Sequence, residues 1–366
     1  VLVGKTDMDE FAMGSAGHYS ALGRCVNPLD PTRSAGGSST GAAASVAAGE
    51  AYFALGSDTG GSARQPASFC GLVSMKPTYG RISRFGLVEF ASSMDTVCPI
   101  TRTVADNRLV LSAIAGPDAR DMTTIAAEPR LERCADSLAG LRVGVMAGYA
   151  ELCDAATVRA AERIKAILAD AGAIVTTVSL PSPEIAVDVY VTTAAAEASS
   201  NLARYDGIRY GAGAEGSAFA EMVTNARTTG LGAEVKRRIL AGKFALSSVL
   251  NGDYYRRVSA VRAKIGKEID EILRTVDVVL MPTTATVAFP TVLPGEDPDT
   301  LYESDAFTVY ANLTGLPAIQ IPAGGDGKLP CGVSFFGGRG AESLLYNVAA
   351  YCERMTEPYR AEWRCV

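Results

Sequence analysis

The sequence predicts a layered α/β fold in which helices enclose a sheet. Residues 141–146 and 174–180 are short apolar runs typical of strands, and residues 155–170 between them have the periodicity of an amphipathic helix. Further apolar runs predict core strands at 276–281, 313–322 and 332–337. Because strands and helices alternate along the chain, these patterns favour the α/β class.

Local signals mark the ends of several helices. Asp154 is suited to cap the amino end of the 155–170 helix, and Gly172 is suited to end it. Other helical patterns fall at 41–49, 103–114, 190–202, 233–240, 253–274 and 341–355. The 253–274 pattern is rich in Arg and Lys, which would suit contact with RNA or a partner, but the interspersed acids favour an ordinary solvated face.

Length and composition narrow the class of protein. With 366 residues, 48% hydrophobic and 20% charged, the chain can bury a large core, as one large domain or two ordinary ones. It has no apolar run of membrane-spanning length, so we expect a soluble protein with no membrane association. With a net charge of -6, the chain has no overall positive potential that would bind RNA phosphates. Eight cysteines without CxxC pairs indicate a reduced, cytoplasm-like environment.

Two glycine-serine clusters stand out as the candidate site of chemistry. Gly36-Gly37-Ser38-Ser39 and Gly60-Gly61-Ser62 flank a segment of small residues that predicts a tightly packed helix. A glycine-rich loop ending in serine offers several main-chain N–H groups beside a hydroxyl. Acyl transfer needs this combination for an oxyanion hole and its nucleophile.

Three other interpretations of these clusters are weaker. Residues 56–62 have the glycine spacing of a phosphate-binding P-loop, but Gly61 stands where that motif requires lysine. No GxSxG elbow surrounds either serine, which argues against an α/β-hydrolase. Glycine-rich loops are also ordinary turns, and the presence of two such clusters around one helix makes that interpretation weaker.

The number of histidines limits which residue could act as the base for a serine nucleophile. His18 is the single histidine, and its polar surroundings predict a surface loop residue, so a Ser-His-Asp relay is disfavoured and a His-based metal site nearly excluded. A serine nucleophile without histidine points to a relay in which a lysine accepts the proton.

Several long segments resemble the amidase signature family. They are GKTDMDEFAMG (4–14), GGSSTG (36–41), GSDTGGSARQP (56–66), MKPTYGRISRFG (75–86) and FASSMDTVCPITR (90–102). Residues 197–211 and 234–247 are similar to one branch of it, the A subunits of glutamyl-tRNA(Gln)/aspartyl-tRNA(Asn) amidotransferases. The resemblance runs from residue 1 to about residue 353. It implies a single amidase domain over residues 1–366 with a mixed sheet.

The resemblance also implies roles for individual residues. Ser62 matches the acyl-forming nucleophile, and Ser38, after a cis peptide bond, matches the serine that relays a proton between it and a lysine. The main-chain N–H groups of Thr59, Gly60, Gly61 and Ser62 match the oxyanion loop.

A second set of residues matches the part of the family's site that holds the substrate. Arg238 matches the residue that binds the α-carboxylate of glutamine, and a guanidinium suits a carboxylate bidentately. Asp305 matches the residue that binds the α-ammonium group. Tyr190 matches a tyrosine that lines the substrate, although its surroundings diverge from the pattern of the branch.

The sequence departs from the family pattern at the relay lysine. In the family this lysine lies in a segment resembling KDN before the GKT motif, and no KDN occurs here. Lys5 and Lys76 are nearest in sequence to the serines, yet both match positions that the family uses otherwise. We therefore expect the domain to be amino-terminally incomplete relative to the family, either as a fragment or as a variant that has lost the base.

The leading hypothesis from the resemblance is a glutaminase. It would release ammonia from glutamine for the amidation of mischarged Glu-tRNA(Gln) or Asp-tRNA(Asn), in a heterotrimer with B and C subunits. The B subunit would contact tRNA and hold ATP and Mg²⁺, and no cofactor or metal is expected in this chain. A cytoplasmic location is expected, with an organellar one left open. The alternatives are a free-standing amidase of another small amide, and a catalytically impaired scaffold without the lysine.

Overall fold

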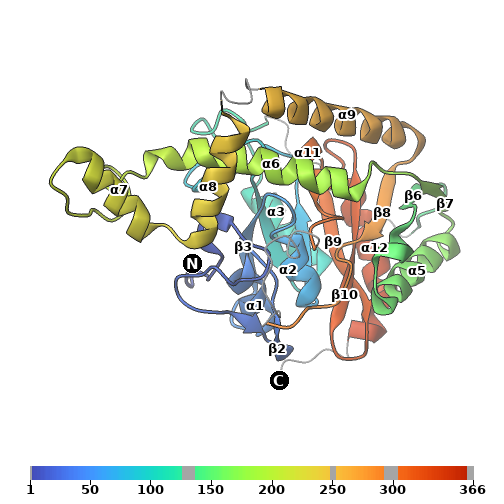
Figure 1. Cartoon of the computed structure of the whole chain (residues 1–366). Helices are drawn as coiled ribbons and strands as arrows, with labels where there is room; N and C mark the ends of the chain where they lie inside the picture. The colour runs from blue at the N-terminus through green and yellow to red at the C-terminus, as the bar shows by residue number, and fades with distance from the viewer. Residues whose placement is uncertain (1, 126–136, 248–252, 292–303, 361–366) are drawn as a thin grey trace.

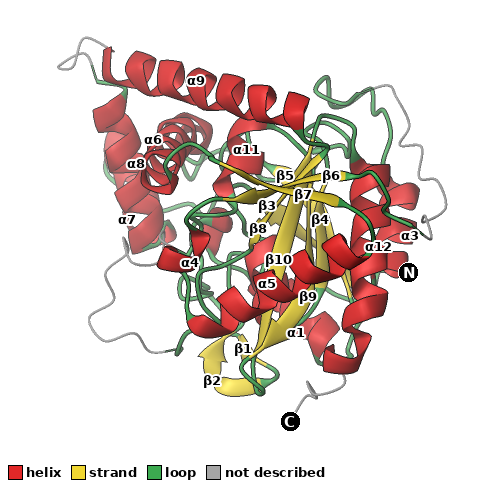
Figure 2. Ribbon diagram, turned by 90° about the vertical axis from the view of Figure 1, so that its right-hand side faces the viewer, coloured by secondary structure: helices red, strands yellow, loops and turns green. Residues whose placement is uncertain are grey.

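An eight-stranded mixed sheet runs through the computed structural model, which describes residues 2–125, 137–247, 253–291 and 304–360. Across the sheet the strands are β3 (Phe53–Asp58), β5 (Thr96–Thr101), β4 (Val73–Lys76), β9 (Ala318–Gly325), β10 (Pro330–Gly337), β8 (Val278–Pro282), β6 (Arg142–Met146) and β7 (Ile174–Val178). Neighbouring strands are antiparallel except that β6 runs parallel to both β7 and β8. The predicted α/β class is confirmed (Figure 2).

The central strands are covered on both faces. Every residue of β8 and β10 is buried, as is β9 up to its last residue, so both faces of these strands must be packed. The edge strands β3 and β7 expose residues instead. The helices that pack on the strands are α1 (Thr40–Ala47), α2 (Arg64–Phe69), α3 (Val104–Ile114), α5 (Ala155–Asp170) and α12 (Glu342–Arg360).

The predicted β-α-β unit forms as β6, α5 and β7. The Asp154 side chain accepts a hydrogen bond from the Thr157 N–H and so caps α5. At the other end Gly172 adopts a positive φ of 84°, which glycine tolerates best. Ile164 and Leu168 are fully buried on the inner face of the helix.

A second group of helices lies beside the sheet. It contains α6 (Pro183–Asn201), α8 (Ala233–Ala245), α9 (Asp253–Thr275) and α11 (Val309–Thr314), and α6 packs against the other three. The helix α7 (Phe219–Gly230) projects away from the body of the molecule (Figure 1). The remaining elements are short: η1 (Glu10–Ala12), β1 (Val26–Asn27), β2 (Asp30–Ser34), α4 (Tyr149–Leu152) and η2 (Leu202–Arg204).

One predicted strand was wrong over its first half. The strand expected at 313–322 begins only at Ala318, because residues before it form α11, which ends at Gly315 with φ 70°. Among the described helices, none has the combination of length and apolar character that crossing a membrane requires.

Candidate active site

The loop that carries Ser62 connects β3 to α2. Its two glycines are required by close neighbours: a Cβ on Gly60 would lie 2.4 Å from Cζ of Tyr190, and one on Gly61 would lie 2.2 Å from Oγ1 of Thr308. Gly61 also has φ 141°, a conformation that other residues rarely adopt. The loop therefore passes between α6 and the start of α11 where no side chain fits, and it leaves Ser62 almost fully buried.

The main-chain N–H groups on either side of Gly60 and Gly61 have no acceptor in the described part of the chain. Within the described residues, no group accepts a hydrogen bond from the N–H groups of residues 59–62. The loop is instead held through other atoms, since the carbonyl of Gly60 accepts from Thr308 Oγ1 at 2.5 Å and that of Gly61 accepts from the Gln65 N–H at 2.8 Å. Buried N–H groups without a partner are rare, and they suit a bound anion or a developing oxyanion.

The Ser38 loop lies directly against the Ser62 loop. The N–H of Ser39 donates to the carbonyl of Ser62 at 3.0 Å, and the Ser39 side chain bonds both main-chain groups of Ser57 at 3.1 Å. The peptide bond between Gly37 and Ser38 is cis, as the resemblance implies. The Ser38 hydroxyl is buried and has no hydrogen-bond partner among the described residues. It is therefore available for proton transfer.

A buried ion pair anchors both ends of the Ser62 loop. Asp58, which precedes the loop, accepts from Arg64 Nε and Nη2 at 2.9 Å each, and Arg64 follows it. Asn312 of α11 donates to Asp58 Oδ1 at 2.9 Å and accepts from Arg64 Nη2 at 2.7 Å. Burial opposes ionisation of Asp58, but the Arg64 guanidinium outweighs it and keeps the pKa of the carboxyl below its ordinary value.

Thr59 is fixed by a second buried carboxylate. Its hydroxyl donates to Asp95 Oδ1 at 2.7 Å, and Asp95 also accepts from the N–H groups of Phe90 and Ala91. Burial raises the pKa of Asp95, and these hydrogen bonds oppose the increase. Thr59 thus helps to set the conformation of the loop through its side chain.

Asp305 lies at the turn that precedes α11. It is buried, and its Oδ2 accepts from the Ser15 hydroxyl at 2.8 Å, while Oδ1 has no partner among the described residues. Burial raises the pKa of Asp305 to about 7, and the Ser15 hydrogen bond and Arg238 both act to lower it. An open carboxylate oxygen in a buried position suits a cationic ligand.

Arg238 is held near this carboxylate from α8. Its Nε donates to Glu234 Oε1 at 2.6 Å, and its guanidinium carbon lies 5.1 Å from the centroid of the Phe90 ring. Burial raises the pKa of both Asp305 and Asp9, and the positive charge of Arg238 opposes that increase. The structure thus brings a fixed cation and a fixed carboxylate into the same region, although they come from distant parts of the sequence.

Tyr190 lies on α6, which borders both the Ser62 loop and a separate cavity. The Tyr190 ring is buried and packs on Gly60, so it contacts the candidate oxyanion loop itself. A cavity of about 620 Å³ lies along α6 and beside Phe307, with Glu184 and Asp188 on its wall. Its described lining residues include none of the predicted site residues, so we do not place the reaction there.

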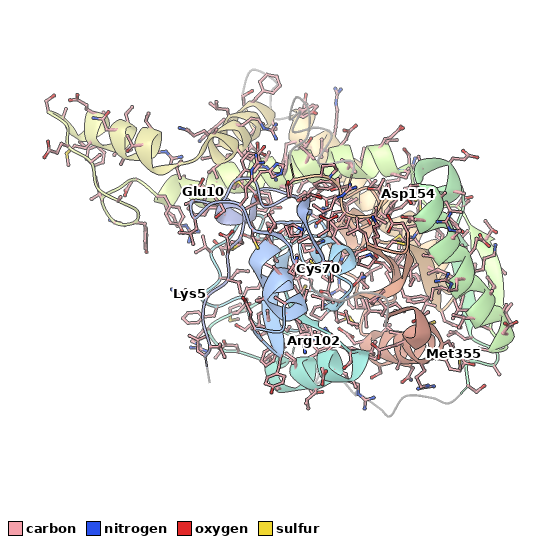
Figure 3. All side chains as sticks on the ribbon, turned by 90° about the horizontal axis from the view of Figure 1, so that it is seen from below. Lys5, Glu10, Cys70, Arg102, Asp154 and Met355 are labelled. Carbon is pink, nitrogen blue, oxygen red and sulfur yellow. The ribbon has the colours of Figure 1, made fainter. Side chains whose placement is uncertain are left out.

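The structure places the two candidate lysines, Lys5 and Lys76, in different environments. Lys5 is exposed and lies at the edge of the molecule (Figure 3). Lys76 is buried, and its Nζ donates to the carbonyl of Pro77 at 2.9 Å. Burial, reinforced by Arg64, lowers the pKa of Lys76 to about 8. No hydrogen bond joins either lysine to Ser38 or Ser62 in the described part of the chain.

The described residues contain no cluster of three or more histidine, cysteine, aspartate or glutamate side chains suited to hold a metal ion.

The single histidine, His18, is half-buried in the loop after Gly14. Its sequence neighbours Gly17 and Tyr19 both donate main-chain hydrogen bonds to the carboxylate of Asp9. Burial raises the pKa of Asp9 to about 6. The sequence interpretation missed Asp9, as it missed the links from Ser15, Gln65, Asp95, Thr308 and Asn312 to the site.

A family model and several curated proteins match this chain over most of its length. A family model described as Amidase matches residues 1–346. Among similar curated proteins is the A subunit of glutamyl-tRNA(Gln) amidotransferase from Desulforudis audaxviator, 47% identical over 98% of this chain and 74% of that protein. The protein of the same description from Moorella thermoacetica is 48% identical over 98% and 74%.

Solved structures also match the chain over most of its length. The A subunit of glutamyl-tRNA(Gln) amidotransferase from Thermotoga maritima superposes with a TM-score of 0.81 at 39% identity, covering 97% of this chain and 73% of that one. A structure described as an amidase gives a TM-score of 0.78 at 28% identity, over 95% and 73%.

Proposed function

The chain belongs to the amidase family, and on this premise we propose that its site hydrolyses the side-chain amide of glutamine. The identities of 47% and 48% to proteins named as A subunits of glutamyl-tRNA(Gln) amidotransferase support this choice within the family. The observation that carries the proposal is the Ser62 loop: a buried serine beside main-chain donors that no described residue uses.

Glutamine would be oriented by its α-amino and α-carboxylate groups. The open Oδ1 of Asp305 would accept a hydrogen bond from the α-ammonium group, and Arg238 would bind the α-carboxylate. Tyr190 would close the site over Gly60. A substrate held at this end presents its side-chain amide at a defined distance from the nucleophile, which lowers the entropic barrier to attack.

The proposed reaction proceeds through an acyl-enzyme. Oγ of Ser62 attacks the side-chain carbonyl carbon, and its proton passes to Ser38 and on to a base, a lysine by resemblance to the family. N–H groups of residues 59–62 stabilise the oxyanion. The proton returns through Ser38 to the leaving nitrogen, so that ammonia departs. Water then attacks the ester along the same route, giving glutamate and free Ser62.

The ammonia would serve a tRNA-dependent amidotransferase. By resemblance, this chain would act with B and C subunits, and the B subunit would contact the mischarged tRNA and supply the ATP and Mg²⁺ site. The names of the relatives support participation in such a complex. We expect the protein to work in the cytoplasm.

Ammonia release from glutamine tests the proposal. Removing an acyl-forming nucleophile typically costs several orders of magnitude in rate, so Ser62→Ala should abolish the activity of the chain assayed with its partner subunits. Ser45→Ala on α1 is the matched control, since among the described residues its hydroxyl bonds no group other than the carbonyl of Ala42. Unchanged turnover in Ser62→Ala would reject the mechanism. Hydrolysis of simple amides with glutamine ignored would favour a free-standing amidase instead.

A further inference from the structure

Gln65 occupies a central and fully buried position in the candidate site. It lies on α2, three residues after Ser62, and its side chain is 0% exposed. A buried amide is costly unless its polar atoms are hydrogen-bonded, and both polar atoms of this one are used.

The amide oxygen of Gln65 binds the loop that carries Ser38. It accepts a hydrogen bond from the N–H of Gly37 at 2.9 Å, immediately before the cis bond to Ser38. The fit is close, because a Cβ on Gly36 would lie 2.4 Å from this oxygen. The position of the Ser38 loop is therefore tied to the helix that follows Ser62.

The amide nitrogen of Gln65 binds the substrate side of the site. It donates to the carbonyl of Ser15 at 2.8 Å and more weakly to Ser304 Oγ at 3.3 Å. The hydroxyl of the same Ser15 donates to Asp305 Oδ2 at 2.8 Å. A continuous path of hydrogen bonds thus runs from Gly37 through Gln65 and Ser15 to Asp305.

We propose that Gln65 is a positioning residue that couples the Ser38 loop to the Asp305 carboxylate, and so fixes the spacing between the reacting groups and the α-ammonium subsite. This inference rests on the proposed function of Asp305. Gln65 itself touches neither nucleophile nor substrate in this role. Gly37 offers an N–H donor and Ser15 offers a carbonyl acceptor, so the side chain between them must both accept and donate a hydrogen bond. The amide of Gln65 does both.

The test compares two readouts in four forms of the protein. The first is the ratio of affinities for glutamine and for glutaramate, which lacks the α-amino group, measured by calorimetric titration. The second is the rate at which a fluorophosphonate labels Ser62, since that probe has no α-ammonium group. The forms are wild type, Gln65→Leu, Ser15→Ala and Gln320→Leu. Gln320 is a matched control, because it is a fully buried glutamine whose amide has no partner among the described residues.

The wild type should prefer glutamine by about tenfold or more, as expected for a buried charge-assisted hydrogen bond. In Gln65→Leu most of this preference should be lost, and the fluorophosphonate should label Ser62 at least several-fold more slowly. Ser15→Ala should weaken the preference near neutral pH, with a smaller effect on labelling, and Gln320→Leu should behave as the wild type does. If Gln65→Leu does not fold, Gln65→Asn replaces it, because an amide one methylene shorter cannot span both partners.

The outcomes separate this inference from the proposed function. A wild type that binds both ligands equally would reject the role of Asp305, while slower labelling of Gln65→Leu would still support its link to the serine loop. A wild type that prefers glutamine, with Gln65→Leu equal to it in preference and labelling, would overturn the coupling and leave the proposed function standing. Equal losses in Gln320→Leu would also overturn it.

Discussion

Titration of Asp305 should control the affinity for glutamine near neutral pH. Burial raises the pKa of this carboxyl to about 7 in the free protein, and only its ionised form attracts an α-ammonium group. With a pKa of about 7, roughly nine tenths of the carboxyl is ionised at about pH 8 and roughly one tenth at about pH 6. The affinity for glutamine should therefore fall about tenfold over this range as the pH decreases.

Calorimetric titrations of glutamine between these pH values measure the effect, and glutaramate is the control ligand because it has no α-ammonium group. Asp9, whose pKa burial raises to about 6, also titrates here, so Asp305→Asn is needed to assign the change. The variant should bind glutamine weakly at all pH values. Ser15→Ala removes a hydrogen bond that lowers the pKa of Asp305, and should move the fall to higher pH. A wild-type affinity that is constant with pH would refute the reasoning.

Two further substitutions test how the Ser62 loop is held. Asp58→Asn breaks a fully buried ion pair and leaves Arg64 uncompensated, so chemical denaturation should show a loss of about 3–5 kcal/mol. The matched change Asp277→Asn, at a partly exposed ion pair, should cost about 1 kcal/mol or less, and equal losses would contradict the account. Gly61→Ala meets Thr308 and an unfavourable φ, and should reduce ammonia release about 100-fold or more, as loss of an oxyanion donor does. Activity within a few-fold of wild type would show that the loop conformation is dispensable.

The fold could be predicted where local pattern and burial agree. The β6-α5-β7 unit has apolar strands, a capping aspartate and a terminating glycine, and each formed as expected. The six residues of α2 have no amphipathic pattern because all of them are buried. The apolar pattern at 313–322 predicts a strand throughout, yet its first residues end α11, since a buried helix and a buried strand have similar composition.

The site was predictable only through residues that carry a motif. The glycines and serines of the two loops stand out in the sequence, and the structure places those loops against each other. The supporting contacts join residues far apart in the chain: Ser15 binds Asp305 and Arg64 binds Asn312, and neither pairing follows from any local pattern. Such pairs are determined by tertiary packing, which periodicity and spacing do not encode.

Locating the covalent intermediate tests the central claim most directly. The wild-type chain with its partner subunits would be quenched during turnover of glutamine, digested and mapped by mass spectrometry. The account predicts a γ-glutamyl ester on Ser62 that is absent from Ser62→Ala. A γ-glutamyl group on any other residue, or ammonia release by Ser62→Ala at the wild-type rate, would contradict it.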